Sequence, residues 1–149
     1  MGSSRHLSRA IVMQSIFEWE FRDKKENWED CLKRNAKEAN ISDESLAFSN
    51  ELTLGIINNI EKIKEDLTKY APEWPLSQIS PVDRATLYLG IYELKYANKE
   101  DIPPIVAINE AIEISKEFGG LNSSKFVNGV LCSILSSLYP DGLKKSNES

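Results

Sequence analysis

Histidine and cysteine are scarce in this chain of 149 residues, which contains one histidine and two cysteines. Zinc sites are built from clusters of thiolate and imidazole ligands, and neither cysteine belongs to a CxxC pair. The sequence therefore predicts no metal site. Cys31 and Cys132 both lie on apolar helical stripes. Free cysteines in such places usually pack as small hydrophobic residues, so we expect both to be buried and reduced.

Sequence motifs for catalysis are also missing. The chain has no glycine-rich nucleotide loop, no G-x-S-x-G sequence and no H-E-x-x-H sequence. Its one imidazole, His6, lies near the amino terminus, so a Ser/His/Asp or Cys/His site would have to form around a terminal residue. These absences predict a protein that is not an enzyme and that uses no cofactor.

Long apolar runs are absent too. No segment approaches the roughly 18 apolar residues of a membrane-spanning helix, and the amino terminus lacks the apolar core of a signal peptide. Hydrophobic residues make up 41% of the chain and charged residues 28%, as in soluble globular proteins. We expect a cytoplasmic protein without membrane contacts. One folded domain is predicted over residues 1–143, with a disordered tail over residues 144–149.

Positive charge is in short supply. Lysines and arginines number 18 against 23 aspartates and glutamates, which gives a formal net charge of −5 and a pI near 5.0. Domains that bind nucleic acid are normally basic, so the composition argues against binding through overall charge. Screening over about 8 Å makes a nucleic-acid backbone respond mainly to the patch that it touches. Any such binding must therefore use a local cationic patch.

Apolar residues recur every three or four positions along most of the chain, which is the spacing of amphipathic helices. The pattern predicts a first helix from Leu7 to Phe21 and a shorter one over residues 28–39. It then predicts one continuous helix that runs to Tyr70 after a cap at Ser42 or Asp43. No segment alternates like a strand. The sequence therefore predicts an all-α fold.

Individual glycine, proline and capping residues add detail. Gly55 lies inside the longest helical pattern and costs roughly 1 kcal/mol against alanine, so we expect another backbone to pass close to it. The sequence Ser80-Pro81-Val82-Asp83 predicts a helix start. Ser80 suits the N-cap, Pro81 the first helical position, and Asp83 the positive end of the helix dipole.

The stretch VAINEAIEISKEFGGLNSSKFVNGVL, residues 106–131, predicts two helices joined by a turn. Gly119 and Gly120 suit a left-handed C-cap, and Ser123 or Ser124 suits the N-cap of the second helix. Free amides at that helix start favour an anion such as a phosphate, although any well-capped helical hairpin has similar residues. The other polar residues expected around the start are Asn109, Asn122, Lys125 and Asn128.

This stretch closely resembles the same region of the NusB family of bacterial transcription antitermination factors. The resemblance covers most of the chain. Its other segments, in the order that the family shows, are RHLSRAIVMQSIFEWEF (5–21), FSNELTLGI (48–56) and QISPVDRATLYLGIYEL (78–94). It implies about seven helices in two small bundles, with the N-terminal half packed against the C-terminal half. Periodicity alone does not give that division.

The resemblance also implies binding to RNA. In that family an arginine-rich element contacts the boxA sequence of nascent, single-stranded RNA, and Arg5 and Arg9 match it, with His6 in place of a frequent arginine. A spacing of four residues puts Arg5 and Arg9 on one helix face. Basic residues near a terminus are also common on ordinary solvated surfaces. The RNA-binding residues expected from the resemblance are Arg5, His6, Arg9, Asn122, Ser124 and Lys125.

A protein partner is implied as well. Members of the family form a heterodimer with NusE, a small-subunit ribosomal protein, and act with RNA polymerase during ribosomal RNA synthesis. Phe17 and Asp83 align with positions of that partner surface, and Arg84 is adjacent. Phe17 equally suits the core, and Asp83 equally suits its own helix start. The sequence leaves both a monomer and a homodimer open for the free protein.

Two other functions stay open. RNA cytosine methyltransferases can carry a NusB-like domain ahead of their catalytic domain, so the chain could be a detached N-terminal RNA-binding domain of such an enzyme; it contains no glycine-rich cofactor loop. Alternatively, a NusB-like interaction module could bind proteins and have weak RNA affinity. The net acidity favours that second alternative, and so does the arginine-rich element, which has fewer basic residues here because His6 replaces a frequent arginine.

Overall fold

The protein is built from helices throughout its described part. A computed structural model describes residues 2–142, so the tail predicted over residues 144–149 lies outside the described residues. The described residues form seven α-helices, one short 3-10 helix and no strand, which confirms the all-α prediction. The elements are α1 (Gly2–Phe21), α2 (Trp28–Ala39), α3 (Asp43–Asn58), α4 (Ile60–Tyr70), η1 (Leu76–Gln78), α5 (Pro81–Lys95), α6 (Pro104–Phe118) and α7 (Ser123–Leu138).

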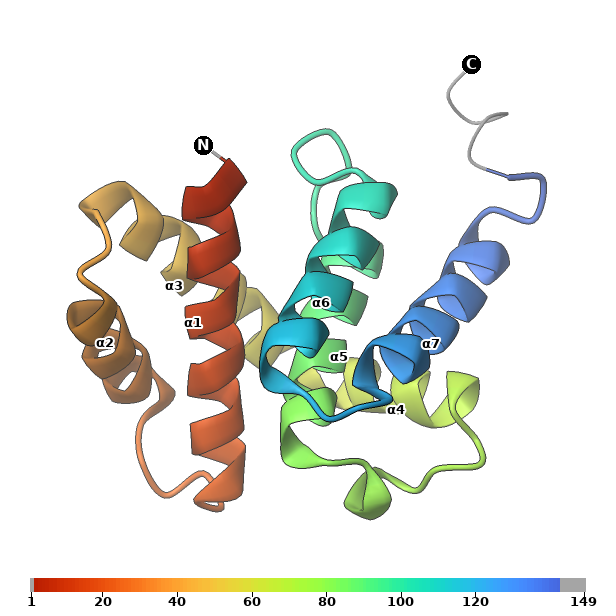
Figure 1. Ribbon diagram of the computed structural model, residues 1–149, viewed down its shortest axis with the longest axis horizontal. Helices are drawn as coiled ribbons and strands as arrows, with labels where there is room; N and C mark the ends of the chain where they lie inside the picture. The colour runs from red at the N-terminus through yellow and green to blue at the C-terminus, as the bar shows by residue number, and fades with distance from the viewer. Residues whose placement is uncertain (1, 143–149) are drawn as a thin grey trace.

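The helices form two bundles that share a central helix (Figure 1). α1, α2 and α3 pack on one another, and α4, α5, α6 and α7 make the second group. α5 contacts α1 as well as α6 and α7, so it joins the two groups. This arrangement confirms the two bundles that the family resemblance implies. No helix in the described part of the chain is both long and apolar enough to span a bilayer.

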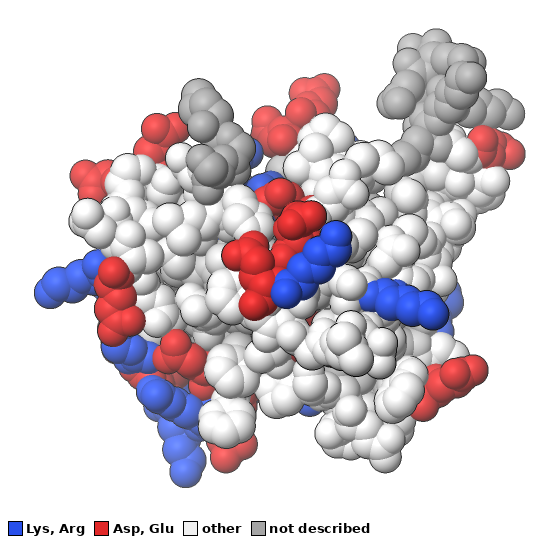
Figure 2. Space-filling view, viewed as in Figure 1, with Lys and Arg blue, Asp and Glu red and all other residues white. Residues whose placement is uncertain are grey.

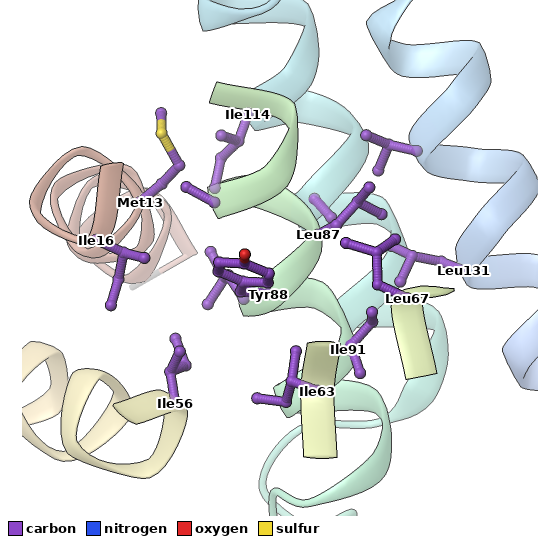
Figure 3. Packing of buried hydrophobic residues seen from close by; sticks show 14 of the residues in the cluster. Met13, Ile16, Ile56, Ile63, Leu67, Leu87, Tyr88, Ile91, Ile114 and Leu131 are labelled. Carbon is purple, nitrogen blue, oxygen red and sulfur yellow. The ribbon is translucent and has the colours of Figure 1, made fainter. Parts of the chain in front are cut away.

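The hydrophobic core lies around α5. All seven residues from Ala85 to Ile91 are buried, and so is Leu94. Side chains from the surrounding helices pack against α5, among them Met13 of α1 and Leu131 of α7 (Figure 3). Burying one such side chain fully contributes about 1.5–3 kcal/mol. A helix that is buried over most of its circumference therefore holds both bundles together.

The chain bends at Asn59, where the sequence predicts one continuous helix up to Tyr70. That prediction is wrong. The backbone at Asn59 has φ −113° and ψ 13°, and its side-chain amide donates to the carbonyl of Gly55 at 2.8 Å. Asparagine side chains that bond to nearby backbone compete with the helix. The apolar spacing continues across the bend, because Ile63 and Leu67 of α4 still reach the shared core.

The start of α5 forms as predicted. The hydroxyl of Ser80 accepts a hydrogen bond from the backbone N–H of Asp83 at 3.2 Å, and Pro81 is the first helical residue. The start of α3 uses Ser42, the first of the two caps considered, whose hydroxyl accepts from the N–H of Ser45 at 3.1 Å. Since Ser80 supplies the cap of α5, the carboxylate of Asp83 is not needed for it.

The two cysteines differ in burial. Cys31 is fully buried in α2, as expected. The expectation for Cys132 is wrong, because this residue is exposed on α7 and its thiol donates to the side-chain oxygen of Asn128 at 3.3 Å. The apolar stripe of α7 that faces the core runs through Val127, Val130 and Leu131, and Cys132 lies beside that stripe.

Gly55 accommodates a side chain of α5, and not the backbone that the sequence predicts. A Cβ atom at this position would lie 2.2 Å from the hydroxyl oxygen of Tyr92 and 2.7 Å from a ring carbon. Those distances are far below van der Waals contact. The glycine therefore lets α3 approach the aromatic ring of Tyr92 closely.

The contact between the bundles includes a buried ion pair. Arg9 of α1 is 3% exposed and Glu93 of α5 is 1% exposed. The guanidinium donates from Nε to one carboxylate oxygen at 2.8 Å and from Nη2 to the other at 3.0 Å. Burial raises the pKa of the Glu93 carboxyl, and Arg9 opposes that rise. Each partner therefore depends on the other to be tolerated inside the protein.

Replacing Gly55 by alanine should destabilise the protein. Alanine normally stabilises a helix interior relative to glycine, but the clash with Tyr92 should lower the free energy of unfolding by about 1–3 kcal/mol. Urea denaturation measures the change. In a Tyr92→Ala background the same substitution should be neutral or stabilising, and an equal loss in both backgrounds would contradict this explanation.

Breaking the Arg9–Glu93 pair should cost more. We expect Arg9→Met to lower the free energy of unfolding by about 3–5 kcal/mol, because Glu93 is left charged and buried. The loss should shrink as the pH falls, since the raised pKa lets the unpaired carboxyl take up a proton.

The matched control is the double variant Arg9→Met/Glu93→Leu, which removes both charges. It should recover most of the stability in urea denaturation at neutral pH, because no uncompensated charge stays buried. If the two single substitutions were simply additive, the ion pair would not be the cause of the loss.

Candidate nucleic-acid interface

The first part of the candidate interface is the start of α1. Arg5 is exposed, and its guanidinium lies 4.4 Å from the ring centre of Phe48 in α3. Arg9 lies over the same ring at 5.4 Å, so the two arginines share one helix face as their spacing predicts. Arg9 is nevertheless an interior residue, held by Glu93. In this conformation it is not available to a phosphate, and Arg5 is the arginine of the pair that meets solvent.

His6 is held between two carboxylates of α6. Its Nδ1 lies 3.1 Å from an oxygen of Glu110, and its Nε2 makes a short contact with Glu117. Burial lowers the pKa of His6, but the hydrogen bonds and charges of Glu117 and Glu110 together outweigh that effect. The pKa is therefore raised above its ordinary value, which favours the charged imidazolium.

The carboxylates of α6 are neighbours of the predicted RNA-binding residues that sequence reasoning missed. Glu110 contacts His6 and also lies 3.4 Å from Nη1 of Arg9. Positions 110 and 117 are two helical turns apart and so lie on one face, a signal that the sequence does contain. Figure 2 shows acidic side chains gathered near the centre of this view, where α1 and α6 lie side by side. The cationic start of α1 thus borders an acidic surface.

The turn between α6 and α7 is built differently from the prediction. Gly119 is not left-handed but extended, with φ −90° and ψ −176°. Glycine is required there because a Cβ would lie 2.5 Å from the hydroxyl of Ser123. That hydroxyl accepts from the N–H of Gly120 at 2.8 Å, so it closes the turn and does not cap α7. Ser124 is the second residue of α7 and is no N-cap either.

The start of α7 exposes polar residues without a side-chain cap. Asn122 takes the N-cap position, but its side chain makes no capping hydrogen bond. Asn122 and Lys125 are exposed, and Ser124 is half-buried. Within residues 2–142 Lys125 has no ionic partner. This helix start can therefore offer an anion free backbone amides and an unpaired ammonium group.

The two parts of the predicted RNA-binding set do not touch. α6 lies between α1 and α7 in Figure 1, so Arg5 and Lys125 belong to helices on opposite sides of it. A ligand that contacts both must therefore cross α6. α6 carries Glu110 and Glu117, which contact His6 of α1.

The expected partner residues lie where α1 ends and α5 begins. Arg84 donates to Glu20 of α1 at 2.7 Å and to the carbonyl of Leu76 at 2.7 Å, so its guanidinium holds the fold together. Phe17 is half-buried and stacks on Phe21, at 5.6 Å between ring centres, and Phe21 is 66% exposed. The Arg84–Glu20 pair thus connects the end of α1, near Phe17, to the start of α5, which carries Asp83.

Asp83 lines a hollow of about 330 Å³ together with Asn122 of the predicted RNA-binding set. One carboxylate oxygen of Asp83 is buried and has no hydrogen-bond partner among the residues that the structure describes. Such an atom is unfavourable unless a ligand or water satisfies it. The aromatic walls are Trp74 and Phe126, which pack edge to face at 6.2 Å. The fold therefore brings a predicted partner residue and a predicted RNA residue to one place, which the sequence did not reveal.

Among the residues that the structure describes, no three His, Cys, Asp or Glu side chains are grouped so that they could hold a metal ion. The polar groups of the interface are donors, acceptors and charges that can position a ligand.

The chain is similar to known proteins over most of its length. The model of the NusB family matches residues 6–136. The transcription antitermination protein NusB of Dehalococcoides mccartyi is 39% identical over 138 residues, which are 93% of this chain and 94% of that protein. The protein of the same name from Bacillus licheniformis is 39% identical over 134 residues, or 90% of this chain and 98% of its own length.

Solved structures show the same fold. NusB of T. maritima has a TM-score of 0.79 and 37% identity, and the match covers 87% of this chain and 89% of that one. A structure described as antitermination factors NusB and NusE in complex with dsRNA has a TM-score of 0.80 over 92% of this chain and 99% of that one. The two sequences are 24% identical, so this likeness shows a shared fold and nothing more. On the family match and the full-length relatives, this chain belongs to the NusB family.

Proposed function

We propose that this protein is a transcription antitermination factor that binds boxA-type single-stranded RNA together with NusE and supports ribosomal RNA transcription by RNA polymerase. One observation carries the proposal: relatives named transcription antitermination protein NusB match 90% or more of the chain at up to 39% identity. The protein acts in the cytoplasm by positioning RNA and protein partners, and it catalyses no reaction.

The RNA surface has outer and inner residues. Arg5 and Lys125, both exposed, bind phosphates, and Asn122 offers its amide to exposed base edges. Arg9 serves as a positioning residue, because its bond to Glu93 fixes the start of α1. With three or four phosphate contacts on a single strand, the logarithm of affinity should fall with the logarithm of salt with a slope of about −2 to −3.

NusE docks on the surface around Phe17, Phe21 and Asp83. The two phenylalanines present a partly exposed aromatic pair, the kind of side chain that anchors protein interfaces. Asp83 contributes the carboxylate oxygen that lacks a hydrogen-bond donor within the described residues. A donor group of the partner satisfies that atom in the complex.

A second function, an interaction module with weak RNA affinity, is favoured by a specific observation. His6 and Arg9, two of the three cationic residues at the start of α1, are already paired with carboxylates of α5 and α6. RNA binding therefore depends on the remaining exposed cations and on the partner. Affinity for boxA RNA with and without NusE separates the two functions.

Removing exposed cations should weaken RNA binding in a salt-dependent way. Lys125→Ala should lower the affinity of the NusE complex for a boxA oligonucleotide and reduce the salt slope by about 0.7, because one phosphate contact is lost. Arg5→Ala should act similarly. Gel-shift titrations at several salt concentrations measure both quantities.

The control is Lys33→Ala, which removes the same charge from an exposed position on α2, across the molecule from α7. It should leave the salt slope unchanged. A duplex of the same sequence tests whether the preference is for single strands. Equal effects of all three substitutions would mean that no local phosphate site exists at Arg5 or Lys125.

Replacing Asp83 should separate partner binding from folding. Asp83→Asn should weaken the affinity for NusE, measured by calorimetry, because a charged acceptor is lost at the interface. The free energy of unfolding should fall by no more than about 1 kcal/mol, since Ser80 caps the helix and only the dipole interaction is removed. Unchanged NusE affinity would assign Asp83 to its own helix start alone.

A further inference from the structure

The cationic start of α1 faces three carboxylates from two other helices. Glu93 of α5 holds Arg9, Glu110 of α6 contacts both Arg9 and His6, and Glu117 of α6 contacts His6. Two cations thus meet three carboxylates in the folded protein. An RNA phosphate that approaches His6 therefore meets carboxylates that already occupy its donors, although the sequence places a basic element there.

The hydrogen bonds of His6 require the charged form of its ring. A neutral imidazole has one N–H donor, whereas the imidazolium has two. Both ring nitrogens lie against carboxylate oxygens, one on Glu110 and one on Glu117. The raised pKa of His6 agrees with that geometry. His6 is thus a cation whose two donors are both in use.

The two carboxylates are not equally easy to displace. The side chain of Glu110 is 22% exposed and is shared with Arg9, whereas that of Glu117 is 47% exposed and has His6 as its ionic partner within residues 2–142. Glu117 can turn into water at low cost, because its other side already faces solvent. Its departure frees the Nε2 donor of His6 on the outer side, while Glu110 continues to hold Nδ1.

We propose that Glu117 competes with RNA for His6 and thereby sets the RNA affinity of this protein. A phosphate oxygen takes the place of the Glu117 carboxylate on the Nε2 donor, and no covalent bond changes. The inference rests on the proposed RNA-binding function and adds to it an internal acidic competitor on α6. The other charged groups of this surface are Arg5, Arg9, Glu93, Glu110, Glu113 and Lys116.

The substitution Glu117→Gln tests the proposal, and Glu113→Gln is its matched control. Glu113 is on the same helix, is exposed, and lies 3.9 Å from Lys116 without contacting His6. Both variants lose one negative charge from α6, so long-range electrostatics change alike. In gel shifts with a boxA oligonucleotide and NusE, Glu117→Gln should raise the affinity about five-fold over Glu113→Gln, as expected when one partly exposed ion pair no longer competes.

A second measurement does not need RNA. The chain has one histidine, so the imidazole proton signals in an NMR titration of the full chain belong to His6 alone. Glu117→Gln should lower the pKa of His6, and Glu113→Gln should leave it nearly unchanged. RNA affinity of the unchanged protein should fall as the pH rises through the pKa of His6, because the ring loses its charge, and in Glu117→Gln this fall should occur at lower pH.

The outcomes are distinct. An unchanged pKa of His6 in Glu117→Gln would show that the contact is absent in solution and overturn the proposal. A lowered pKa with equal RNA affinities of the two variants would overturn it as well, because Glu117 would then hold His6 without competing with RNA. If the protein and both variants fail to bind RNA with NusE present, the proposed function itself fails and this inference falls with it, whatever the NMR titration shows.

Discussion

A buried ion pair, Arg9 with Glu93, fixes how the first helix lies against the central helix. Its two hydrogen bonds join α1 to α5 and favour one position and rotation of α1. Desolvation of two charges offsets much of their attraction, so the pair contributes less to net stability than to a single arrangement of the bundles. That rotation turns His6, which lies three residues before Arg9, toward α6. The acidic surroundings of His6 thus follow from the packing of α1 on α5.

This constraint explains why the start of α1 offers so little exposed positive charge. A guanidinium that is buried and paired with a carboxylate adds little to the electrostatic potential outside the protein. Burial, and not position in the sequence, therefore determines which basic residues contribute to that potential. Arg5 meets solvent while Arg9, four residues later, does not. A surface with so few exposed cations gives a weak salt dependence and little affinity for nucleic acid in general. Such a protein gains specificity from neighbours, including a partner that covers adjacent surface.

Much of the fold could be predicted from the sequence, and the site only in part. Apolar spacing predicts the helices because each buries one or more faces, and Ser80 predicts the start of α5 because capping is local. The bend at Asn59 is not visible in that spacing, since both flanking helices face one core. The burial of Arg9 depends on Glu93, which is 84 residues away in the sequence. No local pattern connects them, so only the packing of α1 on α5 distinguishes an inner arginine from an outer one.

The hollow beside Asp83 gives the two proposed ligands a common boundary. It lies between the start of α5 and the start of α7, and its lining includes Asn122 and Phe126. A protein that supplies a donor to the unpaired oxygen of Asp83 therefore also touches the helix start assigned to RNA. Filling the hollow would bring a second surface beside Asn122. Coupling between two ligands is reciprocal, so whatever the partner adds to RNA affinity, RNA must add to partner affinity.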